Sequence, residues 1–178
     1  TGYGVERTVI NDGDFPRLFF NYAVGIKDVF SSDFEYEKVQ FYYRHPWQLG
    51  GVGKLTTTLE AGKTFGEVPL GLLNVVPGNQ TLFSIYGTYP LLDFYEFVTD
   101  TYTSVHLEHN FNGRFLGRIP LLRDLNLREI VAVRAVTGSI SDENQALNAS
   151  YSNPVLMAPS NKPYWSYSVG IGNIFKVF

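Results

Sequence analysis

Long runs of side chains that alternate between apolar and polar constrain this chain more than any other feature of its sequence. The longest run covers residues 17–27, where every second side chain is apolar: Leu18, Phe20, Tyr22, Val24 and Ile26. A period of two is typical of a β-strand, because successive side chains of a strand point to opposite faces. An α-helix would need an apolar stripe with a period near 3.6 residues, and this run has none. The chain is therefore predicted to be all-β.

Five further segments repeat this alternation, at residues 38–44, 54–62, 102–111, 127–136 and 165–172, and a weaker seventh strand is predicted near 82–89. Several of these runs are nine to eleven residues long. Strands in soluble proteins usually have about five or six residues, whereas a tilted strand that crosses a bilayer needs about nine to eleven. The lengths favour an antiparallel transmembrane β-barrel segment with about seven long strands.

The polar faces of these strands indicate the inner wall of a barrel. They are rich in Gly, Ser, Thr, Asn and Tyr, whereas a face turned to bulk water would be dense in charge. The charged side chains expected to face the lumen are Arg17, Lys27, Lys38, Arg44, Lys54, Glu60, Glu108, Arg128 and Arg134. The excess of basic groups raises the hypothesis of a mild preference for anions. The alternative is that cross-strand salt bridges among these groups only stabilise the wall.

Composition excludes several classes of protein. The net charge is −3 with a pI of about 5.6, so the basic surface that a nucleic-acid-binding protein needs is absent. The chain has no cysteine, which excludes a disulfide scaffold. The long uncharged stretch at residues 68–92 contains Pro69, Pro77 and Pro90. Because prolines at this density break helices, we reject a transmembrane helix there.

No sequence motif supports catalysis, a metal site or a cofactor. The glycines before Lys54 resemble a phosphate-binding loop, but Leu55 stands where that motif requires Ser or Thr. His106 and Glu108 would share one face of a strand while His109 points away, so only two ligands would converge. His45 and His109 have no readable catalytic partner. We expect no catalytic residues, no metal and no cofactor.

Three groups of short motifs, in this order and spacing, resemble a known family. They are residues 66–73 with 77–79, residues 108–113 with 118–125 and 128–129, and residues 163–164 with 169–175. Together they are similar to the C-terminal barrel part of large Bacteroidetes-type outer-membrane proteins. Those proteins carry an N-terminal carboxypeptidase-like regulatory domain, a small β-sandwich, before a barrel of uncharacterised function. The resemblance implies an outer-membrane location and supplies no catalytic residues.

From these observations we expect residues 1–178 to form a single segment of an outer-membrane β-barrel. The odd strand count predicts a fragment, with the N-terminal regulatory domain and the final strands outside the sequence. The expected role is a channel, receptor or surface-assembly component without catalysis. Its expected partners are outer-membrane lipid and other envelope proteins, and not nucleic acid. The alternatives are a soluble secreted or periplasmic β-barrel or sandwich that binds a ligand, and an enzyme built on an outer-membrane barrel.

Overall fold

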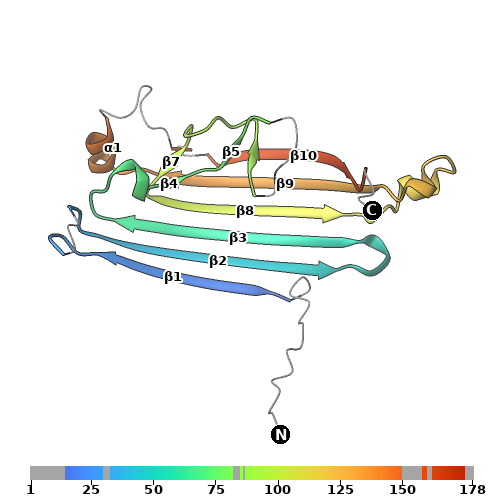
Figure 1. The fold of residues 1–178 in the computed structure, drawn as a ribbon, viewed down its shortest axis with the longest axis horizontal. Helices are drawn as coiled ribbons and strands as arrows, with labels where there is room; N and C mark the ends of the chain where they lie inside the picture. Colours follow the sequence, from blue (N-terminus) through green and yellow to red (C-terminus); the bar gives the residue numbers. More distant parts are fainter. Residues whose placement is uncertain are drawn as a thin grey trace, which may run out of the picture.

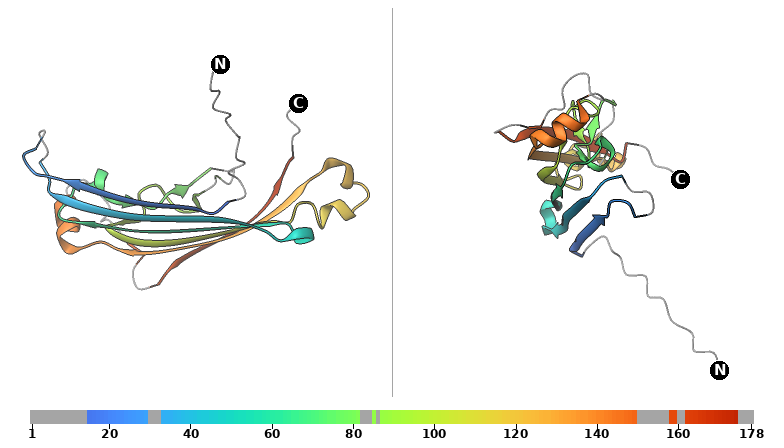
Figure 2. Two further views of the ribbon diagram at one scale, coloured as in Figure 1. Left: turned by 90° about the horizontal axis from the view of Figure 1, so that it is seen from below. Right: turned by 90° about the vertical axis from the view of Figure 1, so that its left-hand side faces the viewer.

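Six long strands form one antiparallel sheet, which dominates the computed structural model of the chain (Figure 1). The structure describes residues 15–29, 33–81, 85, 87–149, 158–159 and 162–174. The strand order is β1-β2-β3-β8-β9-β10, and Figure 2 shows that the sheet is strongly twisted. The strands are β1 (Arg17–Gly25), β2 (Tyr36–Gln48), β3 (Lys54–Phe65), β8 (Thr101–Asn110), β9 (Arg128–Ser139) and β10 (Tyr164–Gly172).

The alternating runs predicted these six strands, and the structure confirms them with shifted ends. Their lengths run from nine to thirteen residues. The largest shift is in β2, which the sequence predicted to end near Arg44 because prolines seldom lie inside strands. The structure continues β2 through Pro46, which pairs with Thr56, to Gln48. The chain then turns through the 3₁₀ segment η1 (Gly50–Val52), closed by a hydrogen bond from the Leu49 amide to the Gly53 carbonyl at 2.9 Å.

The predicted seventh strand near 82–89 is wrong for the residues that the structure describes. Tyr89–Pro90 forms only the two-residue strand β6, and residues 82–84 and 86 lie outside the described ranges. Tyr89 and Leu92 are instead buried in a packed cluster with Val76 and Val136. Their apolar character therefore reflects packing against the sheet and not membership of it. The six strands form an open sheet, so the described residues do not close into a barrel by themselves.

Residues 66–100, named here the cover segment, connect β3 to β8 and hold most of the buried apolar side chains. The cover segment contains η2 (Leu70–Leu72) and four two-residue strands: β4 (Asn74–Val75), β5 (Gly78–Asn79), β6 and β7 (Val98–Thr99). One hydrophobic cluster of the cover segment consists of Val68, Leu73 and Val98. In a second hydrophobic cluster, residues of the cover segment pack against Val136 of β9. The core of the molecule thus lies between the cover segment and one face of the sheet.

Two further elements lie at the ends of the sheet. The helix α1 (Asp142–Asn148) follows β9. Residues 111–127, named here the β8–β9 loop, contain the 3₁₀ turns η3 (Leu116–Arg118) and η4 (Arg123–Leu125). No helix in the described ranges is long and apolar enough to cross a membrane.

Two tyrosines fill the space that directly opposite glycines leave empty. Tyr102 on β8 pairs with Gly62 on β3, and Tyr36 on β2 pairs with Gly25 on β1. A β-carbon added at Gly62 would come within 2.6 Å of the Tyr102 ring. These pairs act as aromatic cover over strand glycines, a device that pins the register of twisted sheets.

We expect Gly62→Ala to lower the free energy of unfolding by about 1–3 kcal/mol, because the new methyl group must displace the Tyr102 ring. A urea titration followed by the fluorescence of the two tryptophans measures the change. Gly170→Ala in β10 is the matched control, since a β-carbon there meets nothing within 4 Å. Equal losses for both variants would contradict the role given to the Gly62–Tyr102 pair.

Candidate functional site

The candidate functional site is the sheet itself, whose two faces differ in chemistry. Directly opposite residues of neighbouring strands lie on the same face of a sheet. The register therefore builds continuous rows across the strands, and one row crosses all six: Leu18, Tyr43, Leu59, Val105, Ala135 and Trp165. The next row contains Leu107, Val133 and Tyr167. The apolar sides of the separate strands thus combine into one apolar face.

This apolar face is exposed. Phe20 and Tyr167 are each 70% exposed and Val169 is 83% exposed. Other large apolar side chains on the same face are also exposed, namely Leu18, Tyr22, Val24, Phe41, Leu107, Trp165 and Ile171. Soluble monomers rarely expose contiguous apolar surface on this scale, and where they do it marks a contact with protein or membrane.

The opposite face is polar and partly buried. Thr58, Ser104 and Ser166, which the register places on this face, are all less than 7% exposed. Gly87 of the cover segment lines a small cavity with Thr58 and other groups of this face. The edge strand β1 is not covered, and Phe19 on its polar side is 59% exposed. The distribution is the inverse of a soluble sheet, which buries its apolar side chains and exposes its polar ones.

Eight of the nine charged residues predicted to line a lumen share this polar face. The register places Arg17 opposite Arg44, and His106 opposite Arg134, in a single row. The others on this face are Lys38, Lys54, Glu60, Glu108 and Arg128. Lys27, the ninth, lies in the turn that follows β1.

Two of these cations have contacts that hold them inside the structure. The Lys38 ammonium donates a hydrogen bond to the Leu72 carbonyl of the cover segment at 3.1 Å. Arg134 is only 3% exposed, and its Nη1 donates to the Ser168 hydroxyl at 3.0 Å. Burying a guanidinium is costly unless polar groups surround it. The small polar residues around Arg134 meet that requirement.

Tyr89 fixes the cover segment to the polar face. Its hydroxyl donates to the Ala135 carbonyl at 3.0 Å, and its ring meets the rings of His106 and Tyr164 edge to face at 5.1 and 6.1 Å. Burial raises the pKa of the Tyr89 phenol far above its ordinary value. The phenol therefore stays protonated and remains a hydrogen-bond donor at all physiological pH values.

The helix α1 fixes the other end of the cover segment through two buried asparagines. The Asn144 Oδ1 accepts a hydrogen bond from the Val68 amide at 2.9 Å, and its Nδ2 donates to the Asp100 carboxylate at 3.3 Å. Asn148 Nδ2 donates to the Val68 carbonyl at 3.0 Å. Asp100 also accepts from the Ser141 amide at 2.7 Å. The sequence analysis missed this cluster, since asparagines in a polar stretch resemble those of any linker.

Aromatic and histidine rings gather where the apolar face meets the β2–β3 turn and the β8–β9 loop. His45 stacks on Trp47 at 3.8 Å, and His109 stacks on Phe111 at 4.1 Å. The four residues His45, Trp47, His109 and Phe111 are named here the aromatic rim. His109 interrupts the apolar pattern of β8, and its Nε2 lies 3.0 Å from the Val52 carbonyl.

The register places His109 on the face opposite His106 and Glu108, as the sequence predicted. Among the described residues no group of three or more His, Cys, Asp or Glu could hold a metal ion.

A comparison with protein families finds one model that matches most of the chain. It is described as the C-terminal domain of a family of unknown function, DUF5686, and it matches residues 2–145. No curated protein and no solved structure matches the chain.

We expect Asn144→Ala to loosen the cover segment, because it leaves the buried Val68 amide without its acceptor, at a cost of about 1–3 kcal/mol. Amide hydrogen exchange at Val68 measures the effect, and it should accelerate by at least about fivefold. Glu143→Gln, on the exposed side of the same helix, is the control. Unchanged protection of Val68 in Asn144→Ala would show that the asparagine does not hold the segment.

Proposed function

Because the chain belongs to the DUF5686 C-terminal domain family, whose function is unknown, we propose a function from its two-faced sheet: it forms part of the wall of an outer-membrane β-barrel. The apolar face contacts lipid and the polar face lines the lumen. The observation that carries the proposal is the exposure of the apolar face together with the burial of small polar side chains opposite it. The protein acts as a structural, receptor or surface-assembly component and performs no chemistry of its own.

Strand length supports the proposal. The six strands have nine to thirteen residues, and a membrane-crossing strand tilted by about 45° needs about nine to eleven. Inside a membrane every backbone N–H and C=O must be paired within the protein, which only helices and closed barrels achieve. In the interior of this sheet, the backbone N–H and C=O groups of each strand pair with those of the neighbouring antiparallel strands.

The two edge strands of the sheet support the proposal that it belongs to a larger barrel. In the described structure β1 and β10 each pair with one strand, β2 and β9 respectively. Known bacterial barrels have at least about eight strands. We therefore propose that further strands continue the sheet from both edges and close it. The outer-membrane location and the carboxypeptidase-like regulatory domain rest on the sequence resemblance and stay predictions.

The cover segment narrows the choice among the proposed roles. It packs Tyr89 and Leu92 against the face that we assign to the lumen. A lumen filled in this way favours a receptor or assembly component over an open channel. The basic groups of the polar face would give the remaining lumen wall a positive field, and such a field favours anions. A reversal-potential measurement tests this proposed preference for anions.

Phe20→Arg and Asn21→Arg test the assignment of the faces. Both residues are exposed neighbours on β1, but only Phe20 lies on the apolar face. Near the bilayer midplane an arginine on the lipid side costs about 2–4 kcal/mol. We expect Phe20→Arg to reduce the fraction of protein that inserts into phosphatidylcholine vesicles, measured by flotation and protease protection, while Asn21→Arg inserts nearly as the parent protein does.

Equal insertion of both variants would contradict the assignment of the faces. A parent protein that stays monodisperse in buffer without detergent would favour the soluble binding module instead.

A further inference from the structure

The β8–β9 loop extends beyond the end of the sheet (Figures 1 and 2). Several of its large apolar side chains are exposed. Leu121 is 87% exposed and Leu125 is 52% exposed. Phe115 and Ile119 are 51% and 45% exposed. Large apolar side chains that are exposed together mark a surface for contact with protein or membrane.

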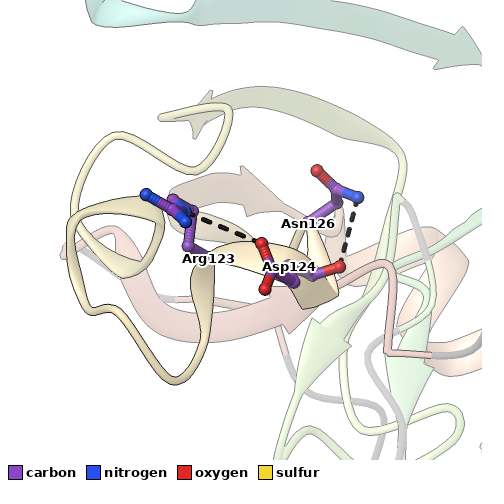
Figure 3. Close-up of polar contacts among 3 residues, drawn as sticks. All are labelled: Arg123, Asp124 and Asn126. Carbon is purple, nitrogen blue, oxygen red and sulfur yellow. Dashed lines mark hydrogen bonds and ion pairs between the residues drawn. The ribbon is translucent and has the colours of Figure 1, made fainter.

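The same loop is basic within an acidic chain. It contains Arg114, Arg118 and Arg123 with Asp124 as its one acidic residue, whereas the whole chain has a net charge of −3. The Arg123 Nε lies 3.6 Å from the Asp124 carboxylate (Figure 3), and both side chains are more than two-thirds exposed. An ion pair in such a position contributes little, so the arginine remains available to another anion.

The loop is fixed at the level of the aromatic rim. The Phe115 ring lies 5.2 Å from the Phe111 ring. The Arg114 Nη1 donates to the Gly51 carbonyl in the β2–β3 turn at 2.6 Å. The Glu129 carboxylate accepts hydrogen bonds from the Phe115 and Leu116 amides. In the proposed barrel these contacts hold the loop where the apolar face ends, which is the boundary between hydrocarbon and headgroups.

We propose that the β8–β9 loop lies in the membrane surface and binds anionic phospholipid. Leu121, Leu125 and their apolar neighbours enter the boundary between headgroups and acyl chains, and the arginines bind headgroup phosphates. Surface-lying segments with apolar groups on one side and arginines on the other bind anionic membranes in this manner. The proposal rests on the proposed function, because only a sheet that spans the bilayer brings the loop to this depth.

The absence of cysteine makes a site-specific test possible. A single cysteine in Leu121→Cys is labelled with an environment-sensitive fluorophore, and the protein is reconstituted into vesicles of phosphatidylcholine and phosphatidylglycerol. We expect a lipid-borne nitroxide to quench this label several-fold more strongly than aqueous iodide does. Leu91→Cys is the matched control, because Leu91 is 91% exposed but belongs to the cover segment. There iodide should be the stronger quencher.

A third label separates the two proposals. Phe20→Cys reports on the apolar face alone. Quenching by the lipid nitroxide at position 20 combined with quenching by iodide at position 121 would overturn the loop proposal and leave the barrel proposal standing. Quenching by iodide at position 20 would overturn the barrel proposal, and the loop proposal with it.

The role of headgroup phosphate is tested with Arg118→Gln and Arg123→Gln combined. Arg114 is left in place because it contacts Gly51. In vesicles that contain phosphatidylglycerol, the loop is in equilibrium between a lipid-embedded and a water-exposed position. Removal of each arginine should shift this equilibrium about fivefold toward the water-exposed position. In pure phosphatidylcholine the shift should be absent. An identical response in both lipid compositions, or none in either, would overturn the phosphate-binding part of the proposal.

Discussion

The packing of the cover segment on one side of the sheet decides what the other side can do. A sheet of six long strands offers two large surfaces, and in the part of the chain that the structure describes, the cover segment packs on the polar surface. Tyr89 and the asparagines of α1 hold that cover in place through buried hydrogen bonds. Among the described residues nothing covers the apolar surface to the same extent, and hydrocarbon is the partner that we propose, because it matches the chemistry of this surface and the length of its strands.

This arrangement reverses the usual relation between burial and stability. In a soluble sheet, the transfer of apolar side chains out of water provides most of the driving force. In the proposed barrel that transfer would occur into lipid, while inside the protein small residues such as Thr58 and Ser166 are buried and Arg134 donates a hydrogen bond to the Ser168 hydroxyl. The interior thus combines the apolar clusters of the cover segment with buried small polar side chains of the sheet. Such an interior accommodates the buried Arg134, the most deeply placed of the eight charged residues on this face.

The sequence predicted the features that depend on local periodicity and missed those that depend on distant contacts. Alternation located all six long strands and assigned residues such as Phe20 and Asn21 to opposite faces. It mistook the apolar residues around Tyr89 for a strand, because packing onto β9 and pairing within a sheet require similar side chains. It also gave no signal for the Asn144–Val68 contact, whose partners are 76 residues apart. The exposed state of Leu121 could not be foreseen either, since exposure depends on how the loop leaves the sheet.

The cross-strand rows also limit how the chain can change during evolution. Loss or gain of one residue inside a strand would move every side chain beyond it to the other face, placing arginines on the apolar face and phenylalanines on the polar face. Length changes inside these strands are therefore tolerated only in pairs, or with a bulge that absorbs the odd residue. The β2–β3 turn and the β8–β9 loop lie outside the strands, so a change of one residue there does not move side chains to the other face. Relatives should therefore differ in length at these two places first.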